Sequence, residues 1–452
     1  MFQKVLIANR GEIAVRIIQA CRDLGIISVA VYSEADREAL HAQIADEAVC
    51  IGPARAAESY LNMDNIISAA LASGCQAIHP GFGFLSENPD FAERTTQAGL
   101  AFIGPTAATI RLMGDKSEAK RNAIAAGVPV ALGTDGPLRD FDEAISEAER
   151  IGYPVMLKAA SGGGGKGIRV ALSVKDLKDA YDSAAAEAVA NFGDGRLYME
   201  KYIHNPRHIE VQILGDSLGN VVHLFERECS VQRRHQKLIE ECPSAFVTPE
   251  LREKMTSAAV ALAKRVGYRS AGTIEFLVDN DRNFYFCEMN TRIQVEHPVT
   301  EQVTGVDLVC EQLRIAAGEP ISFKQEDLVM RGHAIECRIN AEDPSKNFRP
   351  CPGRITDMYL PGGKGVRIDS AIYSGCEVSP YYDSMITKLI VFAATRKEAI
   401  AKMHRALGEV IIEGITTNID FLYEIMERPD YQEGDFTIQY LEKVLEEMGE
   451  NK

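Results

Sequence analysis

Short apolar segments alternate with amphipathic helices over the first hundred residues of this chain, and that alternation restricts the fold more than any other feature of the sequence. Mostly apolar runs at residues 5–9, 27–32, 77–79 and 102–104 predict strands, and residues 12–24 predict a helix. Helices that connect consecutive strands allow those strands to lie parallel in one sheet. We therefore expect an α/β domain with a parallel sheet at the N-terminus.

The remainder of the chain predicts further domains, because 452 residues exceed what one hydrophobic core usually supports. In the middle, helices are predicted at 116–126, 140–151, 174–190 and 248–266, and strands at 153–160, 168–172, 197–202, 208–214 and 221–227. After Gly332, strands are predicted at 333–339, 353–359, 366–369 and 385–393, with one helix at 397–407. No Pro/Ser linker separates these parts, so we expect them to pack together.

Residues 161–167, Ser-Gly-Gly-Gly-Gly-Lys-Gly, form a glycine-rich turn between two predicted strands. They contain a formal G-x-G-x-x-G match, but a dinucleotide fingerprint needs a helix after the glycines, and residues 168–172 predict a strand. Walker A also fails, because Gly167 follows Lys166 where Ser or Thr is required. A glycine hairpin with Lys158 just before it suits a lid whose backbone amides close over phosphates, and a plain surface hairpin is the alternative.

Two alternating strands around a polar turn place acidic side chains opposite one another. A four-residue turn would pair Val278 with Tyr285 and Glu275 with Glu288, and Asn290 would share the face of Glu288. A divalent cation removes the repulsion between facing carboxylates, and oxygen ligands favour magnesium or manganese over zinc. The ribbon therefore predicts such a metal site, with a solvated acidic strand face as the alternative.

Two further polar clusters are candidates for anion binding. One gathers Arg292, Gln294 and Glu296 before a predicted break at Pro298. Arginine binds a planar carboxylate-like ion in bidentate fashion, and a nearby glutamate can take a proton from it. The other cluster, residues 228–237, is basic, and in an acidic chain it favours phosphate or bicarbonate over nucleic acid.

Charge and cysteine usage restrict the partners and the compartment. The chain carries 49 basic and 65 acidic residues, a net charge of −16, which repels nucleic acid and anionic membranes. Ten cysteines without a Cys-x-x-Cys pair predict a reducing compartment. No apolar run reaches the roughly 18 residues of a membrane span, and the N-terminal run ends too early for a secretory signal. We expect a cytoplasmic protein that binds neither nucleic acid nor membrane.

Nine stretches together resemble the biotin carboxylase family over nearly the whole chain. They read IANRGEIAVRI, HPGFGFLSENP, GDKSEAK, GGGGKG, MEKYIHNPRHIEVQ, ERECSVQRRHQKLIEE, EMNTRIQVEHPVTE, GHAIECRINAEDP and PYYDSMITKLI. The resemblance implies a multidomain α/β and α+β fold. Its parts would be a Rossmann-like N-terminal domain (1–113), an ATP-grasp domain (114–330) with a glycine-rich lid (about 131–203), and a mixed α/β C-terminal domain (331–452).

The resemblance also implies roles for individual residues. The nucleotide would contact Lys116, Lys158, Gly164, Gly165, Glu200, Lys201, Tyr202, Ile203, His208, Gln232 and His235. Magnesium or manganese would be held by Glu275, Glu288 and Asn290. Bicarbonate would contact Lys237, Arg292, Gln294 and the backbone of Val295, with Glu296 as the general base and Arg338 stabilising the biotin enolate.

The implied activity is ATP-dependent carboxylation of biotin by bicarbonate through carboxyphosphate, as in the first half-reaction of acetyl-CoA carboxylase in fatty acid biosynthesis. The carboxylase component of a pyruvate or other acyl-CoA carboxylase and another ATP-grasp ligase are the alternatives, and the Arg292 loop together with Arg338 argues against the latter. No Ala-Met-Lys-Met biotinylation sequence occurs. We therefore expect biotin on a separate biotin carboxyl carrier protein. The resemblance further implies carboxyltransferase subunits and a homodimer.

Overall fold

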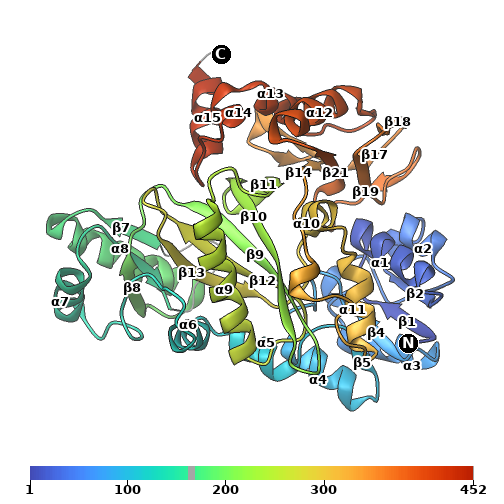
Figure 1. The fold of residues 1–452 in the computed structure, drawn as a ribbon, viewed down its shortest axis with the longest axis horizontal. Coiled ribbons are helices and arrows are strands. Elements are labelled where there is room, and N and C mark those ends of the chain that lie inside the picture. The colour runs from blue at the N-terminus through green and yellow to red at the C-terminus, as the bar shows by residue number, and fades with distance from the viewer. Residues whose placement is uncertain (161–167, 451–452) are drawn as a thin grey trace.

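The computed structural model describes residues 1–160 and 168–450. Its N-terminal part, blue in Figure 1, contains a five-stranded parallel sheet with the order β3-β2-β1-β4-β5, as the sequence predicted. The strands are β1 (Lys4–Ile7), β2 (Ile27–Tyr32), β3 (Glu47–Cys50), β4 (Ala77–His79) and β5 (Ala101–Phe102). The helices are α1 (Gly11–Asp23), α2 (Leu40–Ile44), α3 (Met63–Ala72), α4 (Pro89–Gln97) and α5 (Ala107–Gly114).

Strand β1 is apolar on both faces because both faces of the parallel sheet are covered. Val5 and Ile7 join one buried cluster with Ile13 and Ile17 of α1, which lie four residues apart on one side of the helix. Leu6, which points to the other face, belongs to a second cluster. Successive residues of one strand thus stabilise two layers.

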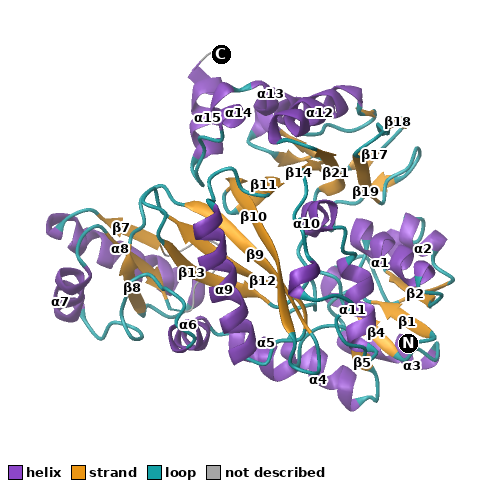
Figure 2. Cartoon of the chain, viewed as in Figure 1, coloured by secondary structure: helices purple, strands orange, loops and turns teal. Residues whose placement is uncertain are grey.

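A second sheet runs through the middle of the molecule (Figure 2). It has eight antiparallel strands in the order β13-β12-β9-β10-β11-β14-β21-β19. They are β9 (Arg207–Gly215), β10 (Val221–Arg233), β11 (Gln236–Cys242), β12 (Ser270–Val278), β13 (Phe284–Asn290), β14 (His333–Asn340), β19 (Val366–Ser370) and β21 (Met385–Ala393). Helices α9 (Pro249–Arg265), α10 (His297–Thr304) and α11 (Leu308–Ala316) pack against it. Because β11 pairs with β14, this sheet continues across the predicted boundary at residue 330.

A third sheet is small and lies to the side of the central one. Its three antiparallel strands have the order β7-β6-β8, with β6 (Val155–Ala159), β7 (Ile168–Ala171) and β8 (Leu197–Lys201). Helices α7 (Phe141–Ile151) and α8 (Val174–Phe192) pack on it, and α6 (Lys116–Ala125) precedes it. The pairing of β6 with β7 confirms the predicted strand–turn–strand, although the turn itself lies outside the described residues.

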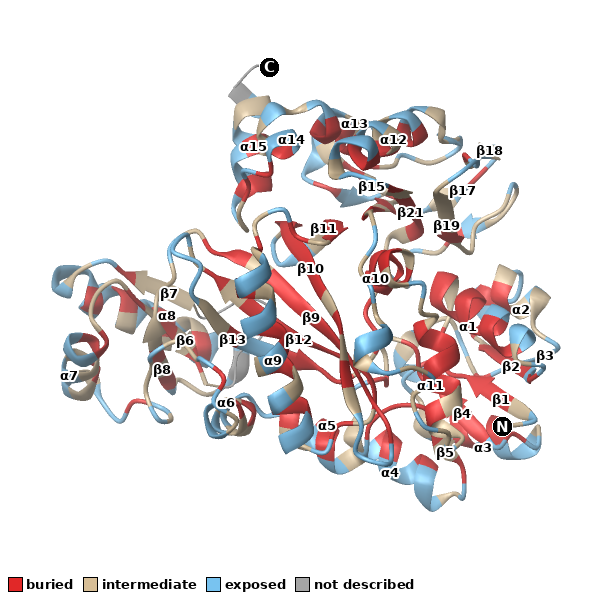
Figure 3. Cartoon of the chain, in the orientation of Figure 1, coloured by how far each residue is buried: buried red, intermediate tan, exposed pale blue. Residues whose placement is uncertain are grey.

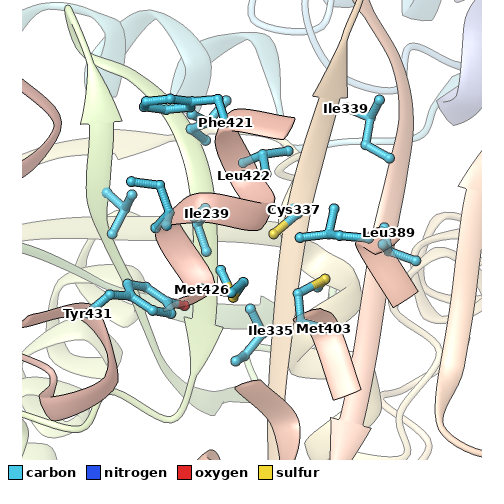
Figure 4. Close-up of a cluster of buried hydrophobic side chains, with 14 of the residues drawn as sticks. Ile239, Ile335, Cys337, Ile339, Leu389, Met403, Phe421, Leu422, Met426 and Tyr431 are labelled. Atoms are coloured by element: carbon cyan, nitrogen blue, oxygen red, sulfur yellow. The ribbon is translucent and has the colours of Figure 1, made fainter. Parts of the chain in front are cut away.

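The C-terminal part covers β14 and β21 with helices α12 (Arg396–Glu409), α13 (Ile419–Glu427), α14 (Pro429–Glu433) and α15 (Tyr440–Glu450). Figure 4 shows their shared core, where Met403, Leu422 and Met426 meet Ile335 and Leu389 of the sheet. The prediction of a single helix here was wrong, because α13–α15 follow one another across short turns that gave no long periodic pattern. The remaining strands are β15 (Glu342–Asp343), β16 (Arg349–Pro350), β17 (Gly353–Arg354), β18 (Met358–Tyr359), β20 (Glu377–Val378) and β22 (Ile411–Ile412).

The predicted strand at 353–359 was also wrong. It divides into β17 and β18, which pair with β20 and β22 in two separate small sheets. At this division the backbone of Gly414 packs against Arg354 and Thr356, so a side chain at position 414 would not fit.

Burial is densest along β9, β10 and β12 and in β1 and α1 (Figure 3). The buried set includes charged side chains, among them Glu210, Arg227, Glu296 and Lys388, each 0% exposed. Charged residues are almost never fully buried unless they are paired. These residues therefore mark a site where the chain has assembled ion pairs inside the protein. In the described part of the chain, no helix has the length and apolar character needed to cross a membrane.

Candidate active site

A cavity of about 1130 Å³ opens between the central sheet, the small sheet and loops of the N-terminal part. It brings together residues that the sequence predicted to bind nucleotide, metal, bicarbonate and biotin. They are Lys116, Lys158, Glu200, Lys201, Tyr202, Ile203, His208, Gln232, His235, Lys237, Glu275, Glu288, Asn290, Arg292, Gln294, Val295 and Arg338. Glu296 is buried directly behind Lys237 and Arg338. Gly164 and Gly165 lie outside the described residues.

The acidic ribbon is formed by β12 and β13, and Glu275 lies opposite Glu288 as predicted. The predicted pairing of Val278 with Tyr285 was wrong, since Val278 pairs with Phe284. The connection between the strands is one residue shorter than predicted, and a bulge in β13 adds one residue back before Glu288. Because the two deviations cancel, the acidic pair keeps its register.

These carboxylates and Asn290 fit a divalent cation. Asn290 Nδ2 donates to Glu275 Oε1 at 2.9 Å, and His208 Nε2 lies 3.0 Å from Glu275 Oε2. Burial, followed by the charge of Glu275, raises the pKa of Glu288 above its ordinary value. A cation between the two carboxylates would offset this repulsion, and the oxygen donors of the set suit magnesium or manganese.

Lys237 on β11 holds three carboxylates together. Its Nζ lies 2.5 Å from Glu210 Oε2, 2.9 Å from Glu275 Oε1 and 2.7 Å from Glu296 Oε1. Burial would lower the pKa of this lysine, but the carboxylates outweigh burial and raise its pKa well above the ordinary value. Lys237 therefore presents a permanent positive charge at the cavity wall.

Glu296 lies between two cations from neighbouring strands. Lys237 Nζ donates to its Oε1, and Arg338 Nη2 donates to its Oε2 at 2.9 Å. Burial would raise the pKa of Glu296, but Lys237 and Arg338 hold it well below its ordinary value. The carboxylate is therefore ionised, and it gains basicity when a ligand in the cavity draws either donor away.

The Arg292 guanidinium is held in place by three side-chain acceptors and, through Nη1, by the Ile293 carbonyl at 3.3 Å. Its Nε donates to Glu87 Oε2 at 2.8 Å, Nη1 to Gln294 Oε1 at 2.8 Å and Nη2 to Asn290 Oδ1 at 3.0 Å. Glu87 lies in the N-terminal part and also accepts a hydrogen bond from the backbone of Thr291. The loop that follows the ribbon is thereby fixed by a residue of the N-terminal part.

The loop ends where α10 begins. Pro298 does not end a segment, as the sequence suggested, but occupies the first turn of this helix, where proline needs no backbone donor. Lys388 of β21, 0% exposed, donates to the Val295 carbonyl at 2.9 Å and lies 3.1 Å from Glu12 of α1. One buried ammonium group thus links the loop to both terminal parts of the chain.

On the nucleotide side, Lys158 of β6 donates to Glu200 of β8 at 2.6 Å, and Lys120 of α6 lies 3.3 Å from the same carboxylate. Burial would raise the pKa of Glu200, but the two lysines hold it below its ordinary value. Lys201 Nζ donates to the carbonyls of Gly152 and Tyr153, at 2.9 and 2.8 Å. The ammonium group of Lys201 is therefore engaged with the backbone of the turn between α7 and β6.

Sequence reasoning missed four residues that hold this site: Glu87, Glu210, Arg227 and Lys388. Arg227 is 0% exposed and donates to Glu210 Oε1 at 2.6 Å, so it fixes the carboxylate behind Lys237. The partners of Glu87 and Lys388 lie far away along the chain, so no local spacing reveals them. All four residues do occur within the stretches quoted above, and that was the available signal.

Protein-family models match three consecutive segments. The model described as "Biotin carboxylase, N-terminal domain" matches residues 1–110, "Carbamoyl-phosphate synthase L chain, ATP binding domain" matches 115–324, and "Biotin carboxylase C-terminal domain" matches 336–443. Biotin carboxylase 1 of Bacillus subtilis is 56% identical over 444 residues, which cover 98% of each chain. A biotin carboxylase of Haemophilus influenzae is 56% identical over 446 residues, which cover 98% of this chain and 99% of that relative. A pyruvate carboxylase component from Methanothermobacter thermautotrophicus is 54% identical, over 98% of this chain and 90% of that relative.

Solved structures show the same architecture. The biotin carboxylase domain dimer of Hydrogenobacter thermophilus 2-oxoglutarate carboxylase, in complex with MgADP, ADP and bicarbonate, is 53% identical with a TM-score of 0.92 and 98% coverage of both chains. A biotin carboxylase–nucleotide complex from Campylobacter jejuni is 51% identical with a TM-score of 0.93, over 98% of this chain and 99% of that one. These likenesses extend over the whole fold.

Proposed function

This chain belongs to the biotin carboxylase family, and from that premise we propose how its own residues carboxylate biotin. The chain is an ATP-dependent ligase that uses bicarbonate and ATP, with magnesium or manganese, to carboxylate biotin on a separate carrier protein. The products are carboxybiotin, ADP and phosphate. The observation that carries the proposal is the position of Glu296, which lies between Lys237 and Arg338 behind a cavity that also contains the Arg292 loop.

Bicarbonate binds among Lys237, Arg292, Gln294 and the backbone of Val295. The guanidinium and the ammonium supply charge-assisted hydrogen bonds to a planar anion. Because Glu296 shares Lys237 with this site, an anion that attracts the lysine weakens its hold on Glu296 and raises the basicity of that carboxylate. Binding of the substrate therefore prepares its own proton acceptor.

In the first step Glu296 takes the bicarbonate proton, and the bicarbonate oxygen attacks the γ-phosphorus of ATP. The bond from that phosphorus to the bridging oxygen breaks, ADP leaves with the electron pair, and carboxyphosphate forms. Lys116 and Lys158 neutralise the phosphates, and the backbone of Gly164 and Gly165 would donate hydrogen bonds to them. The nucleotide is held by Glu200–Ile203, His208, Gln232 and His235. Magnesium or manganese, held by Glu275, Glu288 and Asn290, would supply further positive charge when bound.

In the second step carboxyphosphate breaks into carbon dioxide and phosphate. The phosphate takes the ureido proton of biotin, and the enolate attacks carbon dioxide. Arg338 stabilises the enolate oxygen, because its guanidinium lines the cavity within hydrogen-bond distance of Glu296. The reaction requires a closed cavity, since water would hydrolyse the intermediate.

We propose that the domains extend over residues 1–113, 114–330 and 331–452, with the lid at about 131–203. The partners in this proposal are a biotin carboxyl carrier protein, carboxyltransferase subunits and a second copy of the chain, in the cytoplasm. The domain dimer of the Hydrogenobacter thermophilus relative supports the second copy. The net charge of −16 supports the absence of nucleic acid and membrane partners.

For the acyl acceptor we propose acetyl-CoA, with pyruvate as the second candidate because one of the relatives is a component of pyruvate carboxylase. A strain that lacks the chain distinguishes the two. Supplied fatty acids would restore its growth if acetyl-CoA is the acceptor. Supplied aspartate, which replaces the product of pyruvate carboxylation, would restore growth if pyruvate is the acceptor.

The activity is tested with the purified chain by measuring bicarbonate-dependent ATP hydrolysis and carboxylation of free biotin with labelled bicarbonate. We expect biotin to stimulate ATP hydrolysis and labelled carboxybiotin to appear. Glu296→Gln should lose both activities, and Arg338→Met should lose mainly the biotin-dependent one. Arg349→Met, which changes an exposed arginine of the same C-terminal part, is the matched control. ATP hydrolysis without any stimulation by biotin would favour another ATP-grasp ligase.

A further inference from the structure

Two buried carboxylates lie side by side next to Arg338. Glu240 of β11 and Glu336 of β14 are directly opposite one another in the antiparallel register, and both are 0% exposed. Directly opposed residues place their side chains on the same face, with Cβ atoms about 5 Å apart. The pair therefore brings two acidic groups together in the protein interior.

These two groups are almost without hydrogen-bond donors. Arg338 Nε donates to Glu240 Oε1 at 2.6 Å. Within the described part of the chain, Oε2 of Glu240 and both carboxylate oxygens of Glu336 accept no hydrogen bond. A buried polar atom without a partner is costly, and an unpaired buried charge is more costly still. A proton on one carboxyl would supply the donor that the other lacks.

The surroundings of Glu336 favour its neutral form. Its cross-strand neighbour on β21 is Ile390, which forms an apolar cluster with Val299, Val303 and Ala334 where α10 covers the sheet. Lys388 also lies on β21, but its ammonium group is directed to the Val295 carbonyl and to the carboxylates of Glu12 and Asp369. Glu336 thus has apolar neighbours and one facing carboxylate, and the nearby cations act on it through their charge without donating a hydrogen bond to it.

We propose that Glu240 and Glu336 share a single proton, which Glu336 carries and donates to Oε2 of Glu240, and that this neutral–ionised pair positions Arg338 for the biotin enolate. The second half of this inference rests on the proposed function. In the pair, Glu240 keeps its charge and its bond to Arg338, while Glu336 adds no negative charge beside the place where the enolate forms. Glu336 is a positioning residue that acts through Glu240.

Electrostatics support this arrangement. The charged groups that face the pair are Lys237 on β11, Arg338 on β14, Lys388 on β21 and Glu296 at the start of α10. Burial raises the pKa of Glu240 to about 7. Burial also raises the pKa of Glu336 well above its ordinary value; the charge of Lys388 opposes this shift and the charge of Glu240 adds to it. Because Glu240 has the Arg338 guanidinium within hydrogen-bond distance, it is the member that ionises first.

The test compares Glu336→Gln with Glu336→Met. Glutamine has the size of a protonated glutamate and can donate to Glu240, whereas methionine fills the space without donating. Biotin carboxylation and biotin-independent, bicarbonate-dependent ATP hydrolysis are measured over a range of pH. We expect Glu336→Gln to carboxylate biotin within about twofold of the unaltered protein, and Glu336→Met to lose about tenfold in kcat/KM for biotin with a smaller loss in biotin-independent hydrolysis. The alkaline decline of biotin carboxylation should move to higher pH in Glu336→Gln.

Two measurements do not depend on the proposed function. The infrared spectrum of the unaltered protein near neutral pH should contain a protonated carboxyl band that Glu336→Gln lacks. This band should therefore appear when the spectrum of the variant is subtracted from that of the unaltered protein. A carboxyl whose pKa is raised by folding costs stability as the pH rises from its unfolded pKa toward its folded one. Glu336→Gln should therefore gain in Tm relative to the unaltered protein as the pH rises above about 5.

Several results would overturn the inference. They are a protonated carboxyl band of unchanged intensity in the infrared spectrum of Glu336→Gln, equal losses of biotin carboxylation in the Gln and Met variants, or failure of the Gln variant to fold. If the unaltered chain does not carboxylate biotin, the proposed function fails. The infrared and stability measurements still decide whether the proton is shared.

Discussion

Replacing Glu87 with glutamine should weaken bicarbonate binding, although Glu87 acts on the anion only through Arg292. Glu87 accepts the Nε hydrogen bond of Arg292 at 2.8 Å, and it also accepts the backbone hydrogen bond of Thr291. A glutamine oxygen can still accept one of these bonds, but the amide is neutral. The change therefore removes the ionic component of the contact that orients the Arg292 guanidinium.

The magnitude follows from the exposure of the pair. A charge-assisted hydrogen bond contributes about 1.5–3 kcal/mol when it is buried. The side chains of Arg292 and Glu87 are 19% and 39% exposed, so solvent screening reduces the expected loss to about 1 kcal/mol. Since about 1.4 kcal/mol corresponds to a factor of ten, we expect the KM for bicarbonate to rise about fivefold. The KM for ATP should change little.

The assay is initial-rate ATP hydrolysis as a function of bicarbonate at saturating ATP. Glu93→Gln is the matched control. Glu93 lies on the nearby helix α4, and its Oε2 lies 3.3 Å from Nη2 of an exposed arginine, Arg111. Neither residue lines the cavity. The control should leave the KM for bicarbonate unaltered. An unchanged KM in Glu87→Gln, or an equal rise in the control, would refute the view that Glu87 orients Arg292.

Three further outcomes follow from the buried charges. Arg227→Met should destabilise the protein by about 3–5 kcal/mol in urea denaturation followed by circular dichroism, because Glu210 keeps its buried charge and loses a cation; equal stability would contradict this. Burial would raise the pKa of Glu241, but its partners, Arg396 among them, hold that pKa below the ordinary value, so the ionised carboxylate stabilises the fold above about pH 4.3 and less as the pH falls below that. Glu241→Gln should therefore lower the Tm at neutral pH. A Tm difference from the unaltered protein that stays constant into acid would argue otherwise. Glu288→Gln should weaken Mn²⁺ binding in the presence of nucleotide about tenfold or more, measured by electron paramagnetic resonance, and unchanged affinity would remove Glu288 from the metal site.

The parts of the fold that follow from local periodicity could be predicted from the sequence. The parallel sheet around β1 and the hairpin of β6 and β7 have patterns that extend over whole elements. Strand β11 was missed because its residues, Gln236–Cys242, begin within a basic cluster and carry two adjacent glutamates, which a single-residue alternation does not describe. Helices α13–α15 were missed because α13 and α14 are short and follow one another directly.

The candidate site could be predicted as a set of residues but not as a network. The facing pair of Glu275 and Glu288 follows from strand alternation, and it survived a wrong turn register only because a bulge compensated. The contacts of Lys237 with Glu210 and Glu296 connect three separate elements, and their geometry depends on how the sheet and α10 pack. Tertiary packing, rather than spacing along the chain, decides such contacts.

The unbroken pairing of β11 with β14 has a mechanical consequence. Lys237 and Arg338 stand on adjacent strands, whose backbones are about 4.8 Å apart and joined by ladder hydrogen bonds. A hinge between the two halves of the molecule would have to break that ladder, whereas the small sheet of β6, β7 and β8 has its own separate ladder. Movements of the small sheet during turnover can therefore change access for the nucleotide. The distance between Lys237 and Arg338, across which carbon dioxide passes to biotin, stays constant.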